Sequence, residues 1–187
     1  MRILFPALLG LICLAPLPAA NVPRPATEIK FISQTGETIR LSELKGKVVV
    51  VEFLLTHCAT CKDNARLLGR LQRELDAKGL RVIGLAIDEG AGPKIPMFVQ
   101  ETSAAFPIGV MEHTKAQEFL QFPSVVRMMM PQLAIVDRKG VIREQHGADE
   151  PWMSPAMEET NLRKLIDKLL AEPAGAAAAP KKAAPKK

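Results

Sequence analysis

Residues 48–62 of the chain read VVVVEFLLTHCATCK, a strand-to-helix junction that decides the fold. An apolar run typical of a buried strand leads into a helical pattern whose start carries two cysteines, Cys58 and Cys61, separated by two residues. A thiol at a helix N-terminus lies near unpaired backbone N–H groups and the positive end of the helix dipole, which favour the thiolate that attacks disulfides. The spacing therefore predicts a dithiol redox centre.

The remaining cysteine, Cys13, lies in an N-terminal segment with the features of a secretory signal peptide. Residues 1–20 contain one basic residue, Arg2, then an apolar stretch over 3–17 and a small-residue cleavage region. The stretch is short for a membrane span, although an uncleaved N-terminal anchor is an alternative. We therefore expect a periplasmic or secreted protein with one cysteine pair, which excludes a scaffold held by many disulfides.

The formal net charge of +5 arises outside the predicted domain. Without Arg2 and the four lysines of the C-terminal tail, residues 21–172 carry 20 basic and 20 acidic side chains. This balance of charges does not indicate a nucleic-acid-binding surface. Residues 173–187 consist almost wholly of Ala, Pro and Lys, which predicts a disordered tail that either is simply solvated or is weakly attracted to an anionic membrane.

Short apolar strands alternate with helical patterns along the domain, which predicts an α/β sheet with helices on its faces. A Thr35-Gly36 turn between two short extended segments predicts an N-terminal β-hairpin. We expect hairpin strands over 28–32 and 38–41, further strands over 48–54, 80–87, 107–111, 132–137 and 141–145, and helices over 58–78, 93–103, 114–122 and 158–170.

The order of three phrases around the cysteines resembles the TlpA/ResA-like thiol-disulfide oxidoreductases, a group within the redoxin or AhpC-TSA-like superfamily. The phrases are LSELKGKVVV at 41–50, GLRVIGLAID at 79–88 and PQLAIVDRKG at 131–140, and the likeness covers roughly residues 26–170. The resemblance implies a thioredoxin-like α/β fold, with a central mixed β-sheet flanked by helices and an N-terminal β-hairpin. One such domain is expected over residues 21–172.

The resemblance also implies roles for individual residues. Cys58 would be the attacking thiolate, and Cys61 the resolving thiol that breaks the mixed disulfide. Pro131 would be the cis-proline that faces the pair in this fold, since an X–Pro bond is the peptide link that can be cis at low cost. Met130, the residue before it, would present its backbone to a substrate.

Glu52 stands six residues before Cys58, where thioredoxins keep a buried acid. A carboxyl on a strand of valines should have a raised pKa because of desolvation, and such a group can take up a proton from the inner thiol. The alternative interpretation is a carboxylate at a strand edge that reaches water. The sequence leaves both open.

Three residues around the cysteines depart from the family pattern and are expected to modulate the centre. His57 stands where the family usually has Trp, and Ala59-Thr60 replaces a dipeptide that commonly includes proline. A cationic His57 would stabilise the Cys58 thiolate, whereas a neutral one would only shape the surface. The dipeptide tunes the reduction potential, so the direction of electron flow is not inherited from the family.

A copper-handling protein is the main alternative, because Thr56-His57-Cys58 also resembles the start of the motif in Sco-type copper chaperones. Cys58 and Cys61 with His57 and Met129 would then be the ligands, since thiolate and thioether sulfur suit Cu(I). Against this reading, two residues separate the cysteines, whereas three do so in the Sco pattern. Methionines at 128–130 are also well suited to packing or to a peptide-binding surface.

Two further chemistries are disfavoured. A structural zinc site needs four ligands, and two cysteines with three scattered histidines do not supply a convincing set. A peroxiredoxin centre needs a Thr three residues before its cysteine, and Leu55 occupies that position before Cys58. Peroxidase activity is therefore not expected.

These observations predict an exported enzyme that reduces or exchanges disulfides through Cys58 and Cys61. No cofactor is expected beyond the redox-active disulfide that these two cysteines form. The partners would be cysteine-containing exported proteins, with apocytochrome c or copper-site proteins suggested by family analogy. An upstream membrane thiol donor would return the pair to its reduced form.

Overall fold

The computed structural model describes residues 21–173, so the predicted signal peptide and all but the first residue of the predicted tail lie outside the described residues. The strands are β1 (Arg24–Pro25), β2 (Lys30–Ile32), β3 (Thr38–Arg40), β4 (Val48–Leu54), β5 (Leu80–Ala86), β6 (Ile108–Val110), β7 (Gln132–Val136) and β8 (Val141–Gly147). The α-helices are α1 (Ala59–Leu75), α2 (Ile95–Thr102), α3 (His113–Leu120) and α4 (Glu158–Ala171), and the 3₁₀ turns are η1 (Leu41–Leu44), η2 (Asp76–Lys78), η3 (Gly92–Lys94) and η4 (Pro151–Met153).

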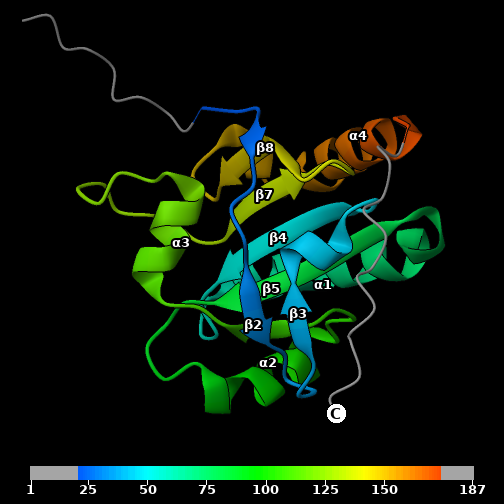
Figure 1. Ribbon diagram of the computed structural model, residues 1–187. Coiled ribbons are helices and arrows are strands. Elements are labelled where there is room, and N and C mark those ends of the chain that lie inside the picture. Colours follow the sequence, from blue (N-terminus) through cyan, green and yellow to red (C-terminus); the bar gives the residue numbers. More distant parts are fainter. Residues whose placement is uncertain (1–20, 174–187) are drawn as a thin grey trace, which may run out of the picture.

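Six strands form one mixed sheet in the order β1-β8-β7-β4-β5-β6. β4 lies at its centre, parallel to β5 and antiparallel to β7. In Figure 1, β7, β4 and β5 cross the middle of the molecule, with the β2–β3 hairpin in front of β5 and α1 behind it. This is the thioredoxin-like arrangement, and the predicted fold class is confirmed.

Two hydrophobic cores lie on opposite faces of the sheet, because successive residues of β4 point to opposite sides. Val48, Val50 and Leu54 belong to the core that α1, α2 and α4 cover. Val49, Val51 and Phe53 belong to the core that the hairpin and α3 cover. The alternation therefore places Glu52 on the face of α1 and α4, the same face that receives Cys61.

The predicted hairpin forms as the separate β2–β3 pair and packs on edge strand β6. The Gln34 backbone N–H donates to the Ile108 carbonyl oxygen at 2.9 Å, and the Gln34 side-chain oxygen accepts from the Ile108 N–H at 2.6 Å. Gly109 permits this close approach, because a Cβ there would lie 2.6 Å from the Ile32 carbonyl oxygen. The hairpin thus covers part of a sheet edge that would otherwise be open to pairing.

The predicted element boundaries differ from the observed ones mainly at the ends. The helix expected over 58–78 consists of α1 followed by the 3₁₀ turn η2, and it ends at Gly79, whose φ is +104°. The pairing of β1 with β8 was not predicted, since a two-residue strand ending in Pro25 has no alternating pattern. Within residues 21–173, no helix is long and apolar enough to cross a membrane.

Candidate dithiol site

Cys58 is the N-cap residue of α1, at the point where the chain leaves β4. Its backbone is extended, with φ −85° and ψ 124°, and its sulfur accepts a hydrogen bond from the Cys61 N–H at 3.2 Å. The sulfur therefore replaces the oxygen of an ordinary N-cap side chain and faces the positive end of a 17-residue helix. This geometry stabilises negative charge on a half-buried sulfur that an incoming disulfide can reach.

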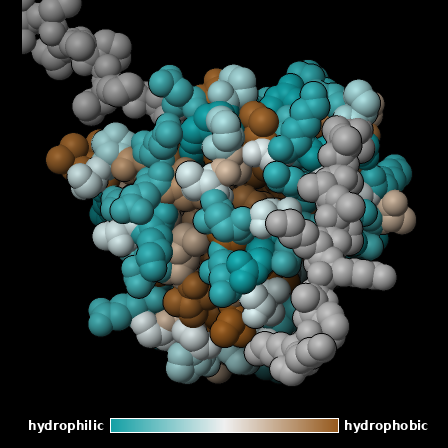
Figure 2. Space-filling view, viewed as in Figure 1, coloured by the Kyte–Doolittle hydropathy of each residue, from teal (hydrophilic) through white to brown (hydrophobic). Residues whose placement is uncertain are grey.

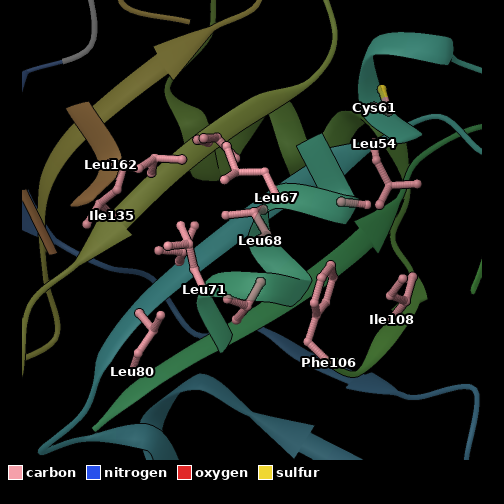
Figure 3. Close-up of a cluster of buried hydrophobic side chains, with 14 of the residues drawn as sticks. Leu54, Cys61, Leu67, Leu68, Leu71, Leu80, Phe106, Ile108, Ile135 and Leu162 are labelled. Carbon is pink, nitrogen blue, oxygen red and sulfur yellow. The ribbon is translucent and has the colours of Figure 1, made fainter. Parts of the chain in front are cut away.

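Cys61 lies one turn further along α1 and is fully buried. Figure 3 shows it at the edge of the hydrophobic cluster, near Leu54. Burial and the adjacent Cys58 raise the pKa of the Cys61 thiol well above its usual range. Cys61 therefore stays protonated at neutral pH, and its sulfur needs a proton acceptor before it can attack.

The Met130–Pro131 peptide bond is cis, and this loop faces the cysteines. The Met130 carbonyl oxygen accepts a hydrogen bond from the Thr60 hydroxyl at 3.2 Å and lies 3.9 Å from the Cys58 sulfur. The Thr60 hydroxyl also lies 3.1 Å from that sulfur. Because the hydroxyl has one proton, it can bond the carbonyl while Cys58 is a thiol and turn to the sulfur when Cys58 is a thiolate.

Glu52 is completely buried, and neither of its carboxyl oxygens has a hydrogen-bond partner. Burial raises the pKa of Glu52 well above its usual value, and the charges of Glu158 and Cys58 raise it further. The Asn64 amide lies close enough to oppose part of this rise, without forming a hydrogen bond of normal geometry. The alternative interpretation, a carboxylate at a strand edge that reaches water, is wrong because β4 is a central strand.

His57 and Ala59 flank Cys58 on the surface. The His57 ring nitrogen Nδ1 lies 3.8 Å from a carboxyl oxygen of Asp88, which is itself largely buried. Asp88 accepts hydrogen bonds from the Thr56 N–H at 2.9 Å and the Thr56 hydroxyl at 2.6 Å. Burial opposes ionisation of Asp88, but the hydrogen bonds from Thr56, Lys94 and the backbone N–H of Asp88 together outweigh it, so the pKa of Asp88 is lowered.

Asp88 thus holds the segment just before Cys58, a role that the sequence reading missed. A signal was available, because Asp88 directly follows the strand predicted over 80–87. The carboxyl ends of neighbouring parallel strands meet at one edge of a sheet, and the dithiol follows the strand over 48–54.

The loop between α3 and β7 carries the methionines of the copper alternative. Met128 is buried in the core under α3, whereas Met129 is 44% exposed and Val125 is 85% exposed. In Figure 2 the tip of this loop forms a hydrophobic projection at the left of the molecule. Within residues 21–173, no three or more His, Cys, Asp or Glu side chains are grouped so that they could hold a metal ion.

A cavity of about 660 Å³ adjoins the dithiol on the side of α4. Thr60 and Pro131 form its wall next to the cysteines, and Asn64 and Glu158 form its inner wall. Burial, and secondarily the charge of Asp63, raise the pKa of Glu158 to about 7. The sequence reading missed Glu158 because an acid in the first turn of a helix is a common surface feature that complements the helix dipole.

The fold and the paired cysteines define a thioredoxin-fold protein with a Cys-x-x-Cys motif at the start of α1. A family model described as AhpC/TSA family matches residues 22–145, so the chain belongs to this family. Among its relatives are two proteins named thiol-disulfide oxidoreductase ResA. The one from Oceanobacillus iheyensis is 30% identical over 86 residues, which cover 45% of this chain and 44% of the relative. The one from Bacillus thuringiensis strain Al Hakam is 28% identical over 110 residues, which cover 59% of this chain and 60% of the relative.

The match therefore spans less than two thirds of the length of these relatives.

Solved structures agree on the fold. A thiol:disulfide interchange protein of the thioredoxin family from Chlorobium tepidum TLS superposes with a TM-score of 0.66 at 18% identity, covering 81% of this chain and 99% of that one. The thioredoxin domain of a thiol-disulfide oxidoreductase from Bacteroides vulgatus superposes with a TM-score of 0.62 at 19% identity, covering 77% of this chain and 96% of that one.

Proposed function

We propose that this protein is an exported thiol-disulfide oxidoreductase that reduces or exchanges disulfides in partner proteins. The observation that carries the proposal is the asymmetry of the two cysteines. Cys58 is reachable, caps α1 and accepts an N–H hydrogen bond, whereas Cys61 is buried one turn behind it. The kinship with thiol-disulfide oxidoreductases supports the same chemistry.

The reaction begins when the Cys58 thiolate attacks one sulfur of a client disulfide. A Cys58–client disulfide forms, and the other client sulfur leaves as a thiolate. Cys61 then attacks the Cys58 sulfur, which forms the Cys58–Cys61 disulfide and releases the second client sulfur. The client gains two electrons and the protein loses two, so no bound cofactor is required.

Glu52 is suited to take the proton that Cys61 loses in the second step. Its pKa is raised by burial and it lies beside the thiol on the same face of the sheet, so it holds a proton more readily than an exposed carboxylate does. The Thr60 hydroxyl would steady the Cys58 sulfur as the mixed disulfide breaks. The Met130 backbone, next to the dithiol, would contact the client chain.

The clients we propose are exported proteins that contain cysteines, with apocytochrome c or copper-site proteins as candidates. The signal-like composition of residues 1–20 supports export to the periplasm or secretion, either as a cleaved protein or through an N-terminal anchor. A membrane thiol donor would then reset the pair. The direction of electron flow depends on the reduction potential of that pair.

A glutathione redox titration tests the proposal, with the thiols followed by alkylation and mass. Cys58 and Cys61 should oxidise together in one reversible two-electron transition. The Cys58→Ser variant should lose exchange with a model disulfide, and Cys61→Ser should accumulate mixed disulfides at Cys58. Exchange that persists in Cys58→Ser would contradict the assignment. Thiols that fail to equilibrate as a pair would favour the Cu(I) alternative with His57 and Met129, which an anaerobic Cu(I) titration would then examine.

A further inference from the structure

The buried polar atoms that lack a hydrogen-bond partner are concentrated beside the dithiol. Among residues 21–173, six buried side-chain nitrogen or oxygen atoms have no partner. Five of these belong to Glu52, Asn64 and Glu158, and only one, in Arg138, lies elsewhere. Buried polar atoms are nearly always paired in native proteins, so five unpaired atoms in one place call for a physical explanation.

The three side chains come from different elements that meet on one face of the sheet. Glu52 points from β4 toward α1 and α4, and it shares this face with Val50 and Leu54. Asn64 stands one turn after Cys61 in α1 and is only 2% exposed. Glu158 begins α4. Asn64 and Glu158 both line the cavity of about 660 Å³, whose wall continues to Thr60 and Pro131.

The cavity has space for waters that can serve as the hydrogen-bond partners these groups lack. One water occupies about 30 Å³ in the liquid, and a buried water needs two to four polar partners. The cavity has room for several waters, and the unpaired atoms of Asn64 and Glu158 supply partners along its inner wall. Its rim includes the exposed residues Asp149 and Pro155, so the space opens to solvent.

Glu52 needs such a connection if it takes up protons. Its side chain is 0% exposed, so it cannot exchange a proton with bulk water directly. Each turnover would leave it protonated, and it would have to lose that proton before accepting the next one. Asn64 is close enough to Glu52 to affect its pKa, and it also lines the cavity.

We propose that Glu52 exchanges its proton with bulk water through waters in this cavity, with the Asn64 amide as the inner contact and the Glu158 carboxyl as the outer one. The inference rests on the proposed function, because the proton concerned is the one that leaves the Cys61 sulfur when this sulfur bonds to Cys58. That proton passes to Glu52 and then, through Asn64-bound water and Glu158, to solvent.

The charges around the cavity favour Glu158 as the outer group. The other ionisable groups that line it are Asp63 and Arg70 on α1, Asp149 and Glu150 before η4, and Glu159 on α4. Most of them are paired: Asp63 bonds Arg66, Glu150 bonds His146, and Glu159 bonds both Arg70 and Arg163. Among residues 21–173, no cation pairs with Glu158 in this way, and the pKa of about 7 lets it take up and release protons near neutral pH.

The experiment isolates the step in which Cys61 attacks. Reduced protein carrying Cys13→Ala, with no further cysteine outside the pair, is mixed with one equivalent of Ellman's reagent. The first equivalent of thionitrobenzoate reports attack by Cys58, and the second reports attack by Cys61 on the resulting mixed disulfide. The rate of the second release is measured against pH in the parent protein and in four variants, each checked for folding by circular dichroism.

Asn64→Leu removes the inner polar contact and fills its space, and should slow the second release about tenfold or more. Asn64→Ser keeps a hydroxyl and leaves room for water, so it should stay within about threefold of the parent. Glu158→Gln should shift the inflection of the pH profile to lower pH, since it removes a negative neighbour of Glu52. Glu159→Gln, the matched control on the same helix, should superimpose on the parent.

The outcomes separate this inference from the function on which it rests. A parent protein that releases only one equivalent would overturn the proposed dithiol mechanism, and the proton path with it. A normal parent with Asn64→Leu at the parent rate, or with Asn64→Ser as slow as Asn64→Leu, would overturn the proton path alone. Equal pH shifts in Glu158→Gln and Glu159→Gln would do the same, because they would show a general charge effect.

Discussion

The two ends of α1 treat buried polar side chains in opposite ways. Near its C-terminal end, Gln72 is buried and fully used: its oxygen accepts from the Val82 N–H at 2.6 Å, and its nitrogen donates to Asp76 at 2.7 Å. Near its N-terminal end, Asn64 is buried as deeply, and its amide has no partner. The amides are alike, so the difference lies in what surrounds them.

The comparison shows which polar groups serve the fold. Gln72 joins α1 to β5 and to the turn after the helix, and it satisfies a backbone N–H that would otherwise be buried without a partner. Asn64 and Glu52 add nothing of this kind, and burying them unpaired costs stability. Groups that weaken the fold beside the proposed dithiol centre are candidates for function. Substituting the unpaired groups near the N-terminal end should therefore slow exchange without destabilising the fold. Substituting Gln72 near the C-terminal end should destabilise the fold without slowing exchange.

The largest expected effect is on the exchange rate of Glu52→Gln. Gln cannot accept the Cys61 proton, so the second thionitrobenzoate release should slow by about 10²-fold or more at pH 7. The free energy of unfolding should rise at pH 7, because a carboxyl with a raised folded-state pKa favours the protonated form and Gln stays neutral. Stopped-flow absorbance and urea titration measure the two quantities. An unchanged rate would remove Glu52 from the mechanism.

Gln72→Ala should show the reverse pattern. The variant leaves the Val82 N–H buried without a partner and should lower the free energy of unfolding by ~1–3 kcal/mol. The rate of its second thionitrobenzoate release, measured at a urea concentration well below the unfolding midpoint, should match the rate of the parent protein. Urea titration and the Ellman assay check this pair of results. A slowed second release in a fully folded Gln72→Ala protein would contradict the claim that Gln72 serves the fold and not the exchange reaction.

A smaller effect on the free energy of unfolding is expected from Glu158→Gln and Glu159→Gln. The two variants should change this free energy in opposite directions. The pKa of Glu158 is raised to about 7, so its contribution to stability is fully present below the unfolded-state pKa near 4.3 and is lost as pH rises through about 7. Glu158→Gln should therefore stabilise the protein at pH 8 relative to the parent, and the difference should vanish near pH 4.

Hydrogen bonds from Arg163 lower the pKa of Glu159, so Glu159 contributes stability above the unfolded-state value and loses it as pH falls. Glu159→Gln should be mildly destabilising at pH 8. Urea titrations at pH 4, 6 and 8 for both variants measure the sign. The same sign for both would contradict the distinct environments that the structure gives them.

The smallest effect should come from Asp88→Asn. Asn can still accept from the Thr56 N–H, but it loses the negative charge opposite Lys94 and His57. A destabilisation below about 1 kcal/mol at pH 7 is expected, with no change in the second release. This loss should shrink as pH falls through the lowered pKa of Asp88. A clear change in release would mean that Asp88 belongs with the proton-handling groups.

Much of the architecture could be predicted because it depends on local patterns. The strand expected over 48–54 is β4 residue for residue, and the predicted hairpin and four helices all form within a few residues of their expected bounds. Strand and helix periodicity, glycine turns and proline positions act over neighbouring residues, and so they are visible in the chain. The pairing of β1 with β8 was missed because it joins residues far apart, with no pattern in Arg24–Pro25 to signal it.

By itself the sequence determined the dithiol and its place at a strand-to-helix junction, because cysteine spacing and hydrophobic period are local properties. It also indicated Glu52 and Pro131 through the family resemblance. Only the tertiary structure decided that Glu52 is wholly buried, that Asp88 holds the segment before Cys58, and that Asn64 and Glu158 meet beside a cavity. The burial and pKa of a carboxyl depend on side chains brought together from different elements, and residues 52, 64 and 158 become neighbours only when the sheet and its helices pack.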